Sequence, residues 1–336
     1  MKKTTIKDIA AILNISPHTV SKALNNKPGV GEEMRQQIKQ TAQELNYIPN
    51  IFGKGLSGKS SKTIGLVLNV TTSPSPTYWY IVTGAEEKAG ACGYNVMLCN
   101  SVEDIQKEAA VIQMLLEKRV DGMIISPVDH PQDNHNLEKV KQAGIPYVLL
   151  ARTIHFQQHP CIRLDSRRGA YLAGKYLIEK GHTNILHLTR QYSLIAVEER
   201  IEGLKAAFHE KGLAFPEENI YRECQETIEN ASYVMLKILR ERRDFTAVLA
   251  YNDVMAFGAM KAVHECRLRI PADVAIMGFD NISFDEISLV PLTTVNRDFY
   301  ALGRAAVEML ICMIEGRQNE CVPALPDSYI VERQSV

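Results

Sequence analysis

Hydrophobic and polar positions follow two different rhythms along the chain. From residue 63 onward, short apolar runs typical of buried strands alternate with stretches whose apolar residues recur every three or four positions, as on one helix face. The strand-like runs cover 63–70, 94–99, 120–127, 146–151, 161–164, 184–189, 245–250 and 273–279, and the helical stretches include 104–118, 166–180, 196–211, 231–241 and 252–265. This alternation predicts doubly wound parallel sheets. Some 270 residues are too many for one such sheet, so we expect two lobes.

The first 45 residues show only the helical rhythm. One helix face is marked by apolar residues three and four positions apart, at Ile6, Ile9, Ala10 and Leu13. Ser16-Pro17 predicts the start of a second helix, because Ser is a preferred N-cap and Pro fits the first helical position. A third helical stretch covers 32–45. Two short helices joined by a tight turn are typical of a helix-turn-helix, whose second helix enters the major groove of DNA.

The outward face of the second predicted helix carries hydrogen-bond donors. His18 and Lys22 can donate to guanine N7 and O6, the atoms that identify this base in the major groove. Ser16, Thr19 and Ser21 can reach phosphates. The alternative is a three-helix packing unit whose polar face is simply solvated.

Charge separates the same two regions. Residues 1–62 hold nine Lys and one Arg against four acidic residues, a net +6, whereas the other 274 residues hold 28 basic and 35 acidic residues, a net −7. The basic segment suggests contact with phosphate, although a solvated basic helix face would give the same sum. A chain with 46% hydrophobic and 23% charged residues is typical of soluble globular proteins. Its apolar runs are far shorter than the roughly 18 residues that span a bilayer, so we expect no membrane partner.

The N-terminal residues and the cysteines bear on the compartment. The sequence MKKTTIKDIA lacks the apolar core of an export signal. The seven cysteines include no C-x-x-C pair and lie mostly in apolar runs, where reduced Cys behaves as a small hydrophobe. We therefore expect a cytoplasmic protein with free thiols.

The chain resembles the LacI family of bacterial transcription regulators along nearly its whole length. The resemblance is carried, in order, by IKDIAAILNISPHTVSKALNNKPGV, LNYIPN, KGLSGKSSKTIGLV, EKRVDGMIISP, GIPYVLL, YLIEKGHTNILHL, YNDVMAFGAMKAV, DVAIMGFDNI and PLTTV. It implies an all-α helix-turn-helix head, a hinge, and an α/β body of two doubly wound parallel-sheet lobes like those of periplasmic sugar-binding proteins. The implied boundaries are 1–49 for the head, 50–62 for the hinge and 63–336 for the effector-binding and dimerisation domain, with lobe 1 at about 63–162 plus 293–322 and lobe 2 at about 163–292 plus 323–336.

The resemblance also implies roles in DNA binding, with Pro17, His18 and Lys22 reading bases. The hinge is implied to form a helix on cognate DNA, from which Leu56 wedges into the minor groove. Such a wedge unstacks a base step at a cost of a few kcal/mol and bends the duplex. The expected DNA contacts are Thr5, Ser16, Pro17, His18, Thr19, Ser21, Lys22, Asn25, Asn50, Lys54, Leu56 and Lys59.

The hinge contains a match to the P-loop pattern, Gly53-x-x-x-x-Gly58-Lys59-Ser60. A P-loop requires a buried strand before it and a helix after it, so that the helix N-terminus holds phosphate. Here a helical stretch precedes the motif and a strand-like run follows it. The inverted order disfavours a P-loop enzyme, which is the alternative from another functional class.

Polar and aromatic residues follow several predicted strands of the body. Because ligands bind at the carboxyl ends of parallel strands, two facing lobes place these residues in the cleft between them. By position, the candidates are Tyr78, Trp79, Ser126, Arg152, Asp165, Asn252 and Asp280. The resemblance implies that Arg200, Asn252 and Asp280 hold the effector. Trp79 has an alternative role as a lobe-core anchor, and Asp165 as the cap of the next helix.

The chemistry of these candidates favours a small polyhydroxylated ligand. An Arg donor with Asp and Asn acceptors can satisfy vicinal hydroxyls. Ala151 stands where the family often has Asp, which shifts the expectation toward an acidic or phosphorylated ligand. A carbohydrate or a derivative leads, ahead of a nucleobase. Asp253 is expected to cap the helix 252–265.

No catalytic, metal or cofactor site is predicted. His155-x-x-x-His159-Pro-Cys161 lacks the second ligand pair of a strong zinc signal, and the chain has no G-x-S-x-G elbow. The predicted function is a ligand-responsive repressor that binds a palindromic operator in double-stranded DNA as a homodimer, because one recognition helix reads too few base pairs. A tetramer is left open. A solute-binding uptake protein is disfavoured by the basic head and the missing export signal.

Overall fold

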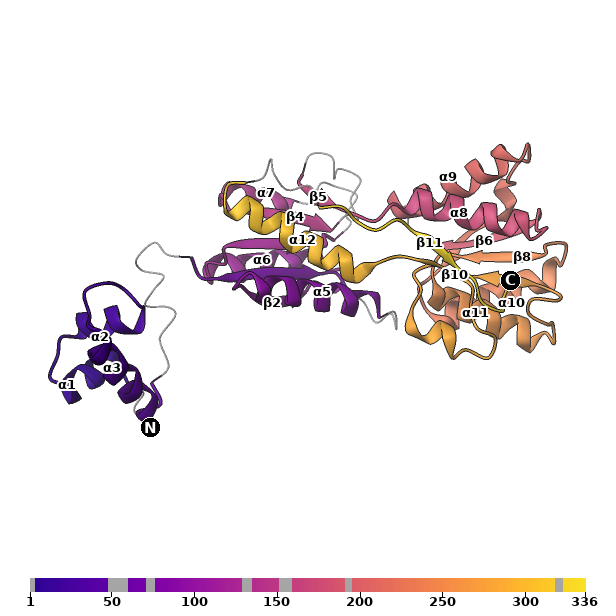
Figure 1. Cartoon of the computed structure of the whole chain (residues 1–336). Coiled ribbons are helices and arrows are strands. Elements are labelled where there is room, and N and C mark those ends of the chain that lie inside the picture. The colour runs from indigo at the N-terminus through magenta and orange to yellow at the C-terminus, as the bar shows by residue number, and fades with distance from the viewer. Residues whose placement is uncertain are drawn as a thin grey trace. The chain divides into compact units, whose positions relative to one another are not determined.

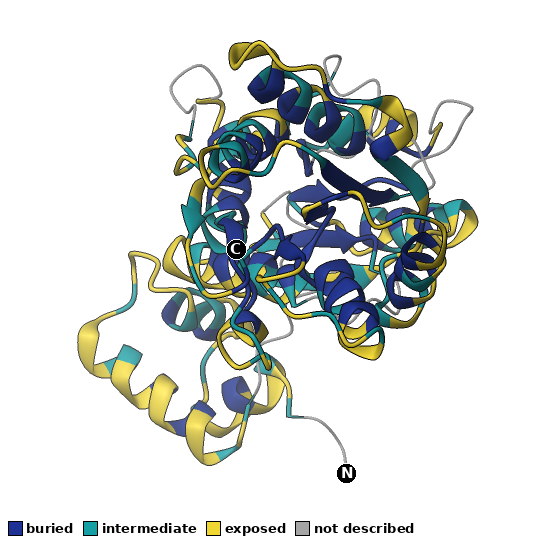
Figure 2. Ribbon diagram, turned by 90° about the vertical axis from the view of Figure 1, so that its right-hand side faces the viewer, coloured by how far each residue is buried: buried dark blue, intermediate teal, exposed yellow. Residues whose placement is uncertain are grey.

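The computed structural model of the chain describes residues 4–47, 60–70, 76–128, 135–150, 159–190, 195–317 and 323–336. The chain divides into two compact units, Met1–Ser61 and Lys62–Val336. We call the described residues 4–47 of the first unit the head and the second unit the body, and each is treated by itself (Figure 1). Buried residues concentrate in the strands and inward helix faces of the body, whereas the head helices are mostly exposed (Figure 2).

The head contains three helices, α1 (Ile6–Ile12), α2 (Pro17–Leu24) and α3 (Glu32–Glu44). They pack around a small core of buried apolar side chains: Ile9, Ala10, Val20, Ala23, Ile38 and Ala42. Arg35 of α3 fixes the turn after α2, because its guanidinium donates to the carbonyl oxygens of Ala23, at 3.1 Å, and Lys27, at 2.9 Å. The helix-turn-helix pattern predicted from the sequence is therefore present.

The first lobe of the body contains a five-stranded parallel sheet in the order β2-β1-β3-β4-β5. Its strands are β1 (Thr63–Leu68), β2 (Asn95–Asn100), β3 (Gly122–Ile125), β4 (Tyr147–Leu150) and β5 (Cys161–Ile162). Its helices are α5 (Thr77–Ala91), α6 (Ile105–Glu117), α7 (His135–Gln142) and α12 (Phe299–Ile314). Leu66 packs with α5 and α12 on one face, and its neighbour Val67 packs with α6 and α7 on the other. Strands β1, β3 and β4 are buried on both faces, as parallel strands usually are, whereas the edge strand β2 is partly exposed.

The second lobe contains a four-stranded parallel sheet in the order β7-β6-β8-β9. Its strands are β6 (Ile185–Arg190), β7 (Ile220–Cys224), β8 (Ala247–Ala250) and β9 (Ala275–Met277). Its helices are α8 (Ser166–Glu179), α9 (Ile195–Glu210), α10 (Ile228–Glu241) and α11 (Asp253–Glu265), with short 3-10 turns η2 (Glu217–Asn219) and η3 (Ser283–Glu286). Gly203 allows α9 to approach α8 closely, since a Cβ there would lie 2.1 Å from the carbonyl oxygen of Arg167. The two predicted doubly wound lobes are confirmed.

The chain passes between the lobes at several points. It leaves the first lobe after β5, returns between β10 (Thr294–Asn296) and α12, and passes over again between α12 and β11 (Tyr329–Val331). Strands β10 and β11 pair antiparallel. Sequence periodicity does not predict β10 and β11, which have only three residues each. It does not predict β7 either, because the partly exposed positions of that strand break the apolar pattern.

Three chemical expectations can be compared with the described residues. In that part of the chain, no helix is long and apolar enough to cross a membrane, and no cluster of three His, Cys, Asp or Glu could hold a metal ion. Cys92, Cys99, Cys224 and Cys266 hold free thiols. Cys312 is disulfide-bonded, so the expectation of free thiols throughout is wrong at this position.

Candidate functional site

The start of α2 presents the predicted base-reading residues. Ser16 caps the helix, because its Oγ accepts a hydrogen bond from the backbone N–H of Thr19 at 3.1 Å. Pro17 occupies the first helical position, where no intrahelical N–H bond is lost. His18 follows and is exposed. The local sequence thus fixes where the helix begins and which donors its first turn displays.

The remaining predicted DNA contacts of the head lie on or beside α1 and α2. Thr5 forms a reciprocal capping box with Asp8 at the start of α1. Lys22 is half-buried, with its ammonium beside Gly29, and the amide of Asn25 donates to the Ser21 carbonyl oxygen at 2.7 Å. His18 and Pro17 are therefore more exposed than Lys22 in the isolated head.

Five predicted site residues lie outside the described residues: Asn50, Lys54, Leu56, Lys59 and Arg152. The P-loop-like motif falls in the same undescribed stretch apart from Ser60, but its surroundings are described. Helix α3 precedes it and strand β1 follows it, which is the inverted order expected from the sequence. That order does not provide a helix N-terminus to hold phosphate.

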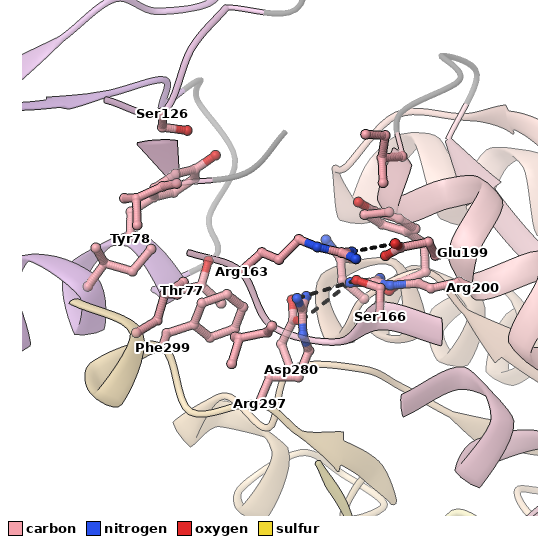
Figure 3. Close-up of a pocket in the computed structure, with 18 of the residues that line it drawn as sticks. Thr77, Tyr78, Ser126, Arg163, Ser166, Glu199, Arg200, Asp280, Arg297 and Phe299 are labelled. Carbon is pink, nitrogen blue, oxygen red and sulfur yellow. Dashed lines mark hydrogen bonds and ion pairs between the residues drawn. The ribbon is translucent and has the colours of Figure 1, made fainter. Parts of the chain in front are cut away.

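A cleft lies in the body where the carboxyl ends of strands from both lobes meet (Figure 3). The first lobe contributes Tyr78 from the first turn of α5 and Ser126 after β3. The second lobe contributes Arg200 from α9, Asn252 after β8 and Asp280 after β9. These five predicted residues are brought together, four of them as the rule for strand ends leads one to expect and Arg200 as the family resemblance implies.

Two predicted cleft residues do not line it. Trp79 is 66% exposed on α5, does not line this cleft and is not part of the lobe core. Its neighbour Tyr78 lines the cleft instead, because successive helix positions point about 100° apart. Asp165 caps α8, its Oδ1 accepting from the backbone N–H of Arg168 at 2.8 Å, and the adjacent Ser166 lines the cleft.

The expected cap of α11 was also wrong by one residue. Asn252 is the N-cap, its Oδ1 accepting from the N–H of Met255 at 2.9 Å. Asp253 is buried one residue further on, where it accepts from the Thr294 hydroxyl at 2.6 Å and from the Ile282 N–H at 3.1 Å. Asp253 therefore ties α11 to the segments on either side of η3 rather than capping the helix.

A buried charge cluster forms the floor of the cleft. Arg200 Nη2 lies 3.8 Å and Arg297 Nη1 lies 3.4 Å from the same oxygen, Oδ1 of Asp280. The Arg200 guanidinium is sandwiched between the rings of Tyr251 and Phe279, at 4.0 and 3.9 Å from their centroids. This stacking fixes the plane of the guanidinium and favours its charge.

Burial sets the titration behaviour of this cluster. It raises the pKa of the Asp280 carboxyl to about 7, against the opposing influence of Arg200 and Arg297. Burial and the neighbouring Arg200 lower the pKa of Arg297. Asp280 also adopts φ of +120°, a conformation that residues with a side chain rarely adopt and that is concentrated at functional sites.

Further ion pairs line the cleft around this floor. The Arg163 guanidinium, after β5, pairs with Glu199 of α9. Glu226 lies 2.9 Å from Arg190 at the end of β6, and Arg190 also lies 3.7 Å from Glu103 of the first lobe. Residues of the two lobes are thus already linked at the rim of the cleft.

Sequence reasoning missed four charged residues that line the cleft: Arg163, Glu199, Glu226 and Arg297. Arg163 and Arg297 each directly follow a short strand, β5 and β10. The predicted strand-like run 161–164 extends two residues beyond β5, which ends at Ile162, and so hides Arg163 from the rule for strand ends. Strand β10 is too short to detect from periodicity, so Arg297 left no comparable signal.

Comparisons with known proteins agree along the whole chain. Residues 5–50 match the model described as "Bacterial regulatory proteins, lacI family", and residues 61–328 match "Periplasmic binding proteins and sugar binding domain of LacI family". The HTH-type transcriptional repressor PurR of Aliivibrio fischeri (strain MJ11) is 32% identical over 337 residues, covering 99% of this chain and 98% of that protein. PurR of Vibrio atlanticus (strain LGP32) is 33% identical with the same coverage.

Solved structures with the same fold include a Lac repressor dimer bound to operator and the anti-inducer ONPF. Its TM-score is 0.87 at 27% identity, with 99% of both chains covered. A LacI family transcriptional regulator from Enterococcus faecium with bound ribose has a TM-score of 0.70 at 27% identity, covering 81% of this chain and 98% of that one.

Proposed function

The chain belongs to the LacI family of bacterial regulatory proteins, and we propose on that premise that it is a ligand-responsive transcriptional repressor. The observation that carries the proposal is the joining of a basic helix-turn-helix head to a body whose cleft is lined from both lobes. A protein of this kind acts in the cytoplasm, where its DNA is found.

The head is proposed to read DNA through the first turns of α2. His18 and Lys22 donate to base edges, and Ser16, Thr19 and Ser21 contact phosphates. A helix of eight residues reads only a few base pairs, so two copies bind a palindromic operator with half-sites about one helical turn apart. The homodimer follows from this requirement, and the operator-bound Lac repressor dimer is a relative that assembles in this way.

The cleft is proposed to bind a small polyhydroxylated effector, a carbohydrate or a derivative. Tyr78 and Phe299 supply flat apolar faces, and Arg200 and Asp280 supply polar groups on the opposite side (Figure 3). Asn252 adds a further polar group to the lining. A ligand that touches both sides has a different affinity for the closed and open arrangements of the lobes, and only that difference can shift the population. The hinge, residues 50–62, is where such a shift would reach the head.

The proposal is tested with the full-length protein in two steps. Selection from a random duplex DNA library is expected to yield a two-fold symmetric consensus. A thermal-shift screen of sugars, sugar phosphates, sugar acids and nucleobases then identifies a compound, since a specific ligand raises the melting temperature. That compound is expected to change the affinity for the selected DNA.

A variant of Arg200, on the cleft floor, and a variant of an exposed arginine form a matched pair. Arg200→Ala is expected to remove the effect of the compound on DNA affinity, because truncating one partner of a buried, hydrogen-bonded charge pair costs about 2–5 kcal/mol of binding free energy. Arg167→Ala, an exposed Arg on α8, serves as the control and is expected to respond like the wild type. Selection of DNA without any sequence preference would contradict the proposed function.

A further inference from the structure

We infer that the effector carries an anionic oxygen group, a carboxylate or a phosphate, bound on the cleft floor by Arg297 together with Arg200. This inference rests on the proposed function, since it names the chemical class of the ligand for the same cleft. The argument comes from the unsatisfied donors and the charge balance of the floor.

The first observation is that each of the two buried guanidiniums has one nitrogen, Nε, without a hydrogen-bond acceptor, although Arg200 Nη1 donates to the Tyr251 carbonyl oxygen. Within the described part of the chain, the Nε atoms of Arg200 and Arg297 are buried and have no hydrogen-bond partner. The terminal nitrogens of Arg297 have only long contacts, 3.4 Å to Asp280 and 3.5 Å to the hydroxyl of Ser166. Because an unpaired buried donor costs about 1–3 kcal/mol, the floor lacks acceptor atoms rather than donors.

The second observation is the charge of the floor. Two arginines share the single carboxylate of Asp280, and both approach the same oxygen. The other charged residues that line the cleft are matched, Arg163 by Glu199 and Glu226 by Arg190. The floor, counted as Arg200, Arg297 and Asp280, therefore carries one net positive charge, although the three Arg and three acidic residues that line the cleft as a whole balance, and any protonation of Asp280 increases the positive charge of the floor. Buried charge of this kind requires a counter-charge.

The third observation is the N-terminus of α8, a helix of 14 residues that begins at the cleft. Ser166, its first residue, is 2% exposed and lines the cleft beside Arg297. The N–H groups of a helix start favour negative charge, which the Asp165 carboxylate already supplies in part by accepting from the Arg168 N–H. The helix start and the two guanidiniums thus favour the same kind of ligand group.

A neutral polyol fits this floor less well. Its hydroxyls need acceptors as well as donors, and the carboxylate of the floor, Asp280, already faces both arginines, while Glu199 and Glu226 elsewhere in the cleft are paired with Arg163 and Arg190. A carboxylate or phosphate brings only acceptors, which matches the two-donor edge of a guanidinium. The carbon skeleton of such a ligand would then extend toward Tyr78 and Phe299 (Figure 3).

The experiment compares matched compounds on the full-length protein by thermal shift and calorimetry at constant ionic strength. Each series contains a neutral sugar, its sugar acid and its phosphate ester, beginning with glucose, gluconate and glucose 6-phosphate and extending through the pentoses and hexoses; inorganic phosphate is included alone. At least one charged member is expected to bind tenfold or more tightly than its neutral counterpart. The acid and ester arms distinguish a carboxylate site from a phosphate site.

The arginine variants assign the preference to the floor. Arg297→Gln is expected to reduce the charged-over-neutral preference at least tenfold, and Arg297→Lys to restore part of it. Arg167→Gln removes one exposed positive charge from the same lobe and is expected to leave the preference unchanged. The inference is overturned if no series shows a charged preference, or if the preference survives in Arg297→Gln.

The outcome of this experiment can be distinguished from the outcome of the test of the proposed regulatory function. If a neutral compound binds best and changes the affinity for the selected DNA, the proposed regulatory function is supported and the inference of an anionic effector is contradicted. If charged compounds bind through Arg297 without any effect on DNA affinity, the inference of an anionic ligand is supported and the proposed regulatory function is contradicted.

Discussion

The head and the body place their charged side chains in opposite surroundings. The proposed DNA contacts of the head lie on exposed or half-exposed positions of α2, where a charged group keeps most of its hydration. The arginines and the aspartate of the cleft are buried among aromatic rings, where each charge needs a partner. Head affinity should therefore follow the number of phosphate contacts and the salt concentration, whereas cleft affinity should follow geometry and charge matching.

The two regions also differ in how much apolar core supports them. The head depends on one cluster of small extent, formed by α1, α2 and α3. The body has four clusters, one on each face of its two sheets. Small domains bury a smaller fraction of their surface and are only marginally stable, so equal damage to the two cores should have unequal consequences.

The largest expected effect comes from the core of the head. Ile9 is fully buried there, and Ile9→Ala should cost about 2–5 kcal/mol, enough to unfold so small a unit. DNA binding should be lost for every sequence, while calorimetry should show the melting transition of the body unchanged. Ile12→Ala is the matched control, since Ile12 lies on the same helix and is 60% exposed. Equal destabilisation of the body by Ile9→Ala would mean that the two units do not fold independently.

The next effect belongs to the body and depends on pH. His187 lies in β6, and its Nδ1 donates to the carbonyl oxygen of Leu249 at 3.0 Å, because that oxygen can only accept. Burial lowers the pKa of His187 to about 4 in the folded protein. Between pH 6.5 and 4 the unfolded chain takes up a proton at this histidine that the folded body does not, so the contribution of His187 to the free energy of unfolding falls with the pH by about 3 kcal/mol, whereas Asp280, whose folded pKa is raised, contributes with the opposite sign.

This pH dependence is measured as the free energy of unfolding of the body from pH 7 to pH 4. His187→Leu should remove the loss of stability due to this histidine and so change the slope across that window, whereas His209→Gln, at an exposed position on α9, should leave the slope as in the wild type. The same slope in His187→Leu as in the wild type would assign the acid sensitivity to other groups.

Sequence reasoning succeeded where one local rule decides the outcome. Ser16-Pro17 began α2 as predicted, because capping involves only neighbouring residues. The alternation of strands and helices gave both sheets, because strands buried on two faces must be continuously apolar. The ends of these strands then located four cleft residues, Tyr78, Ser126, Asn252 and Asp280, since parallel strands present their carboxyl ends on one edge, and the family resemblance added Arg200.

The wrong or missing predictions depend instead on the exact rotation of a helix about its axis or on contacts with distant segments of the chain. Whether Tyr78 or Trp79 faces the cleft depends on the rotation of α5 about its axis, which adjacent aromatic residues do not reveal. Asn252 and not Asp253 caps α11, because Thr294 and Ile282 supply hydrogen bonds to Asp253 from elsewhere in the chain. Arg297 joins Asp280 only through the pairing of a three-residue strand.

A third effect tests base reading by the head. Lys22→Ala should weaken binding to the selected DNA by about 1–3 kcal/mol and relax the preference at one base position, as the loss of a base contact does. Fluorescence anisotropy on the selected site and on single-base variants measures both quantities. Lys39→Ala, an exposed lysine on α3, removes the same charge as a control and should leave the preference unchanged. A uniform loss across all DNA sequences in Lys22→Ala would reassign Lys22 to phosphate.

The smallest effect separates the two roles proposed for Ser16, capping α2 and contacting phosphate. Ser16→Ala should destabilise the head by about 1 kcal/mol, since the hydrogen bond to the Thr19 N–H is lost. Ser16→Asp keeps a capping oxygen and so should keep the stability of the head, but it places a negative charge where phosphate is expected. Thermal unfolding of the head and DNA affinity at two salt concentrations distinguish the roles. If Ser16→Asp binds DNA as well as the wild type at low salt, Ser16 acts only as a cap. Fewer of the exposed groups of the head would then contact phosphate than its surface offers.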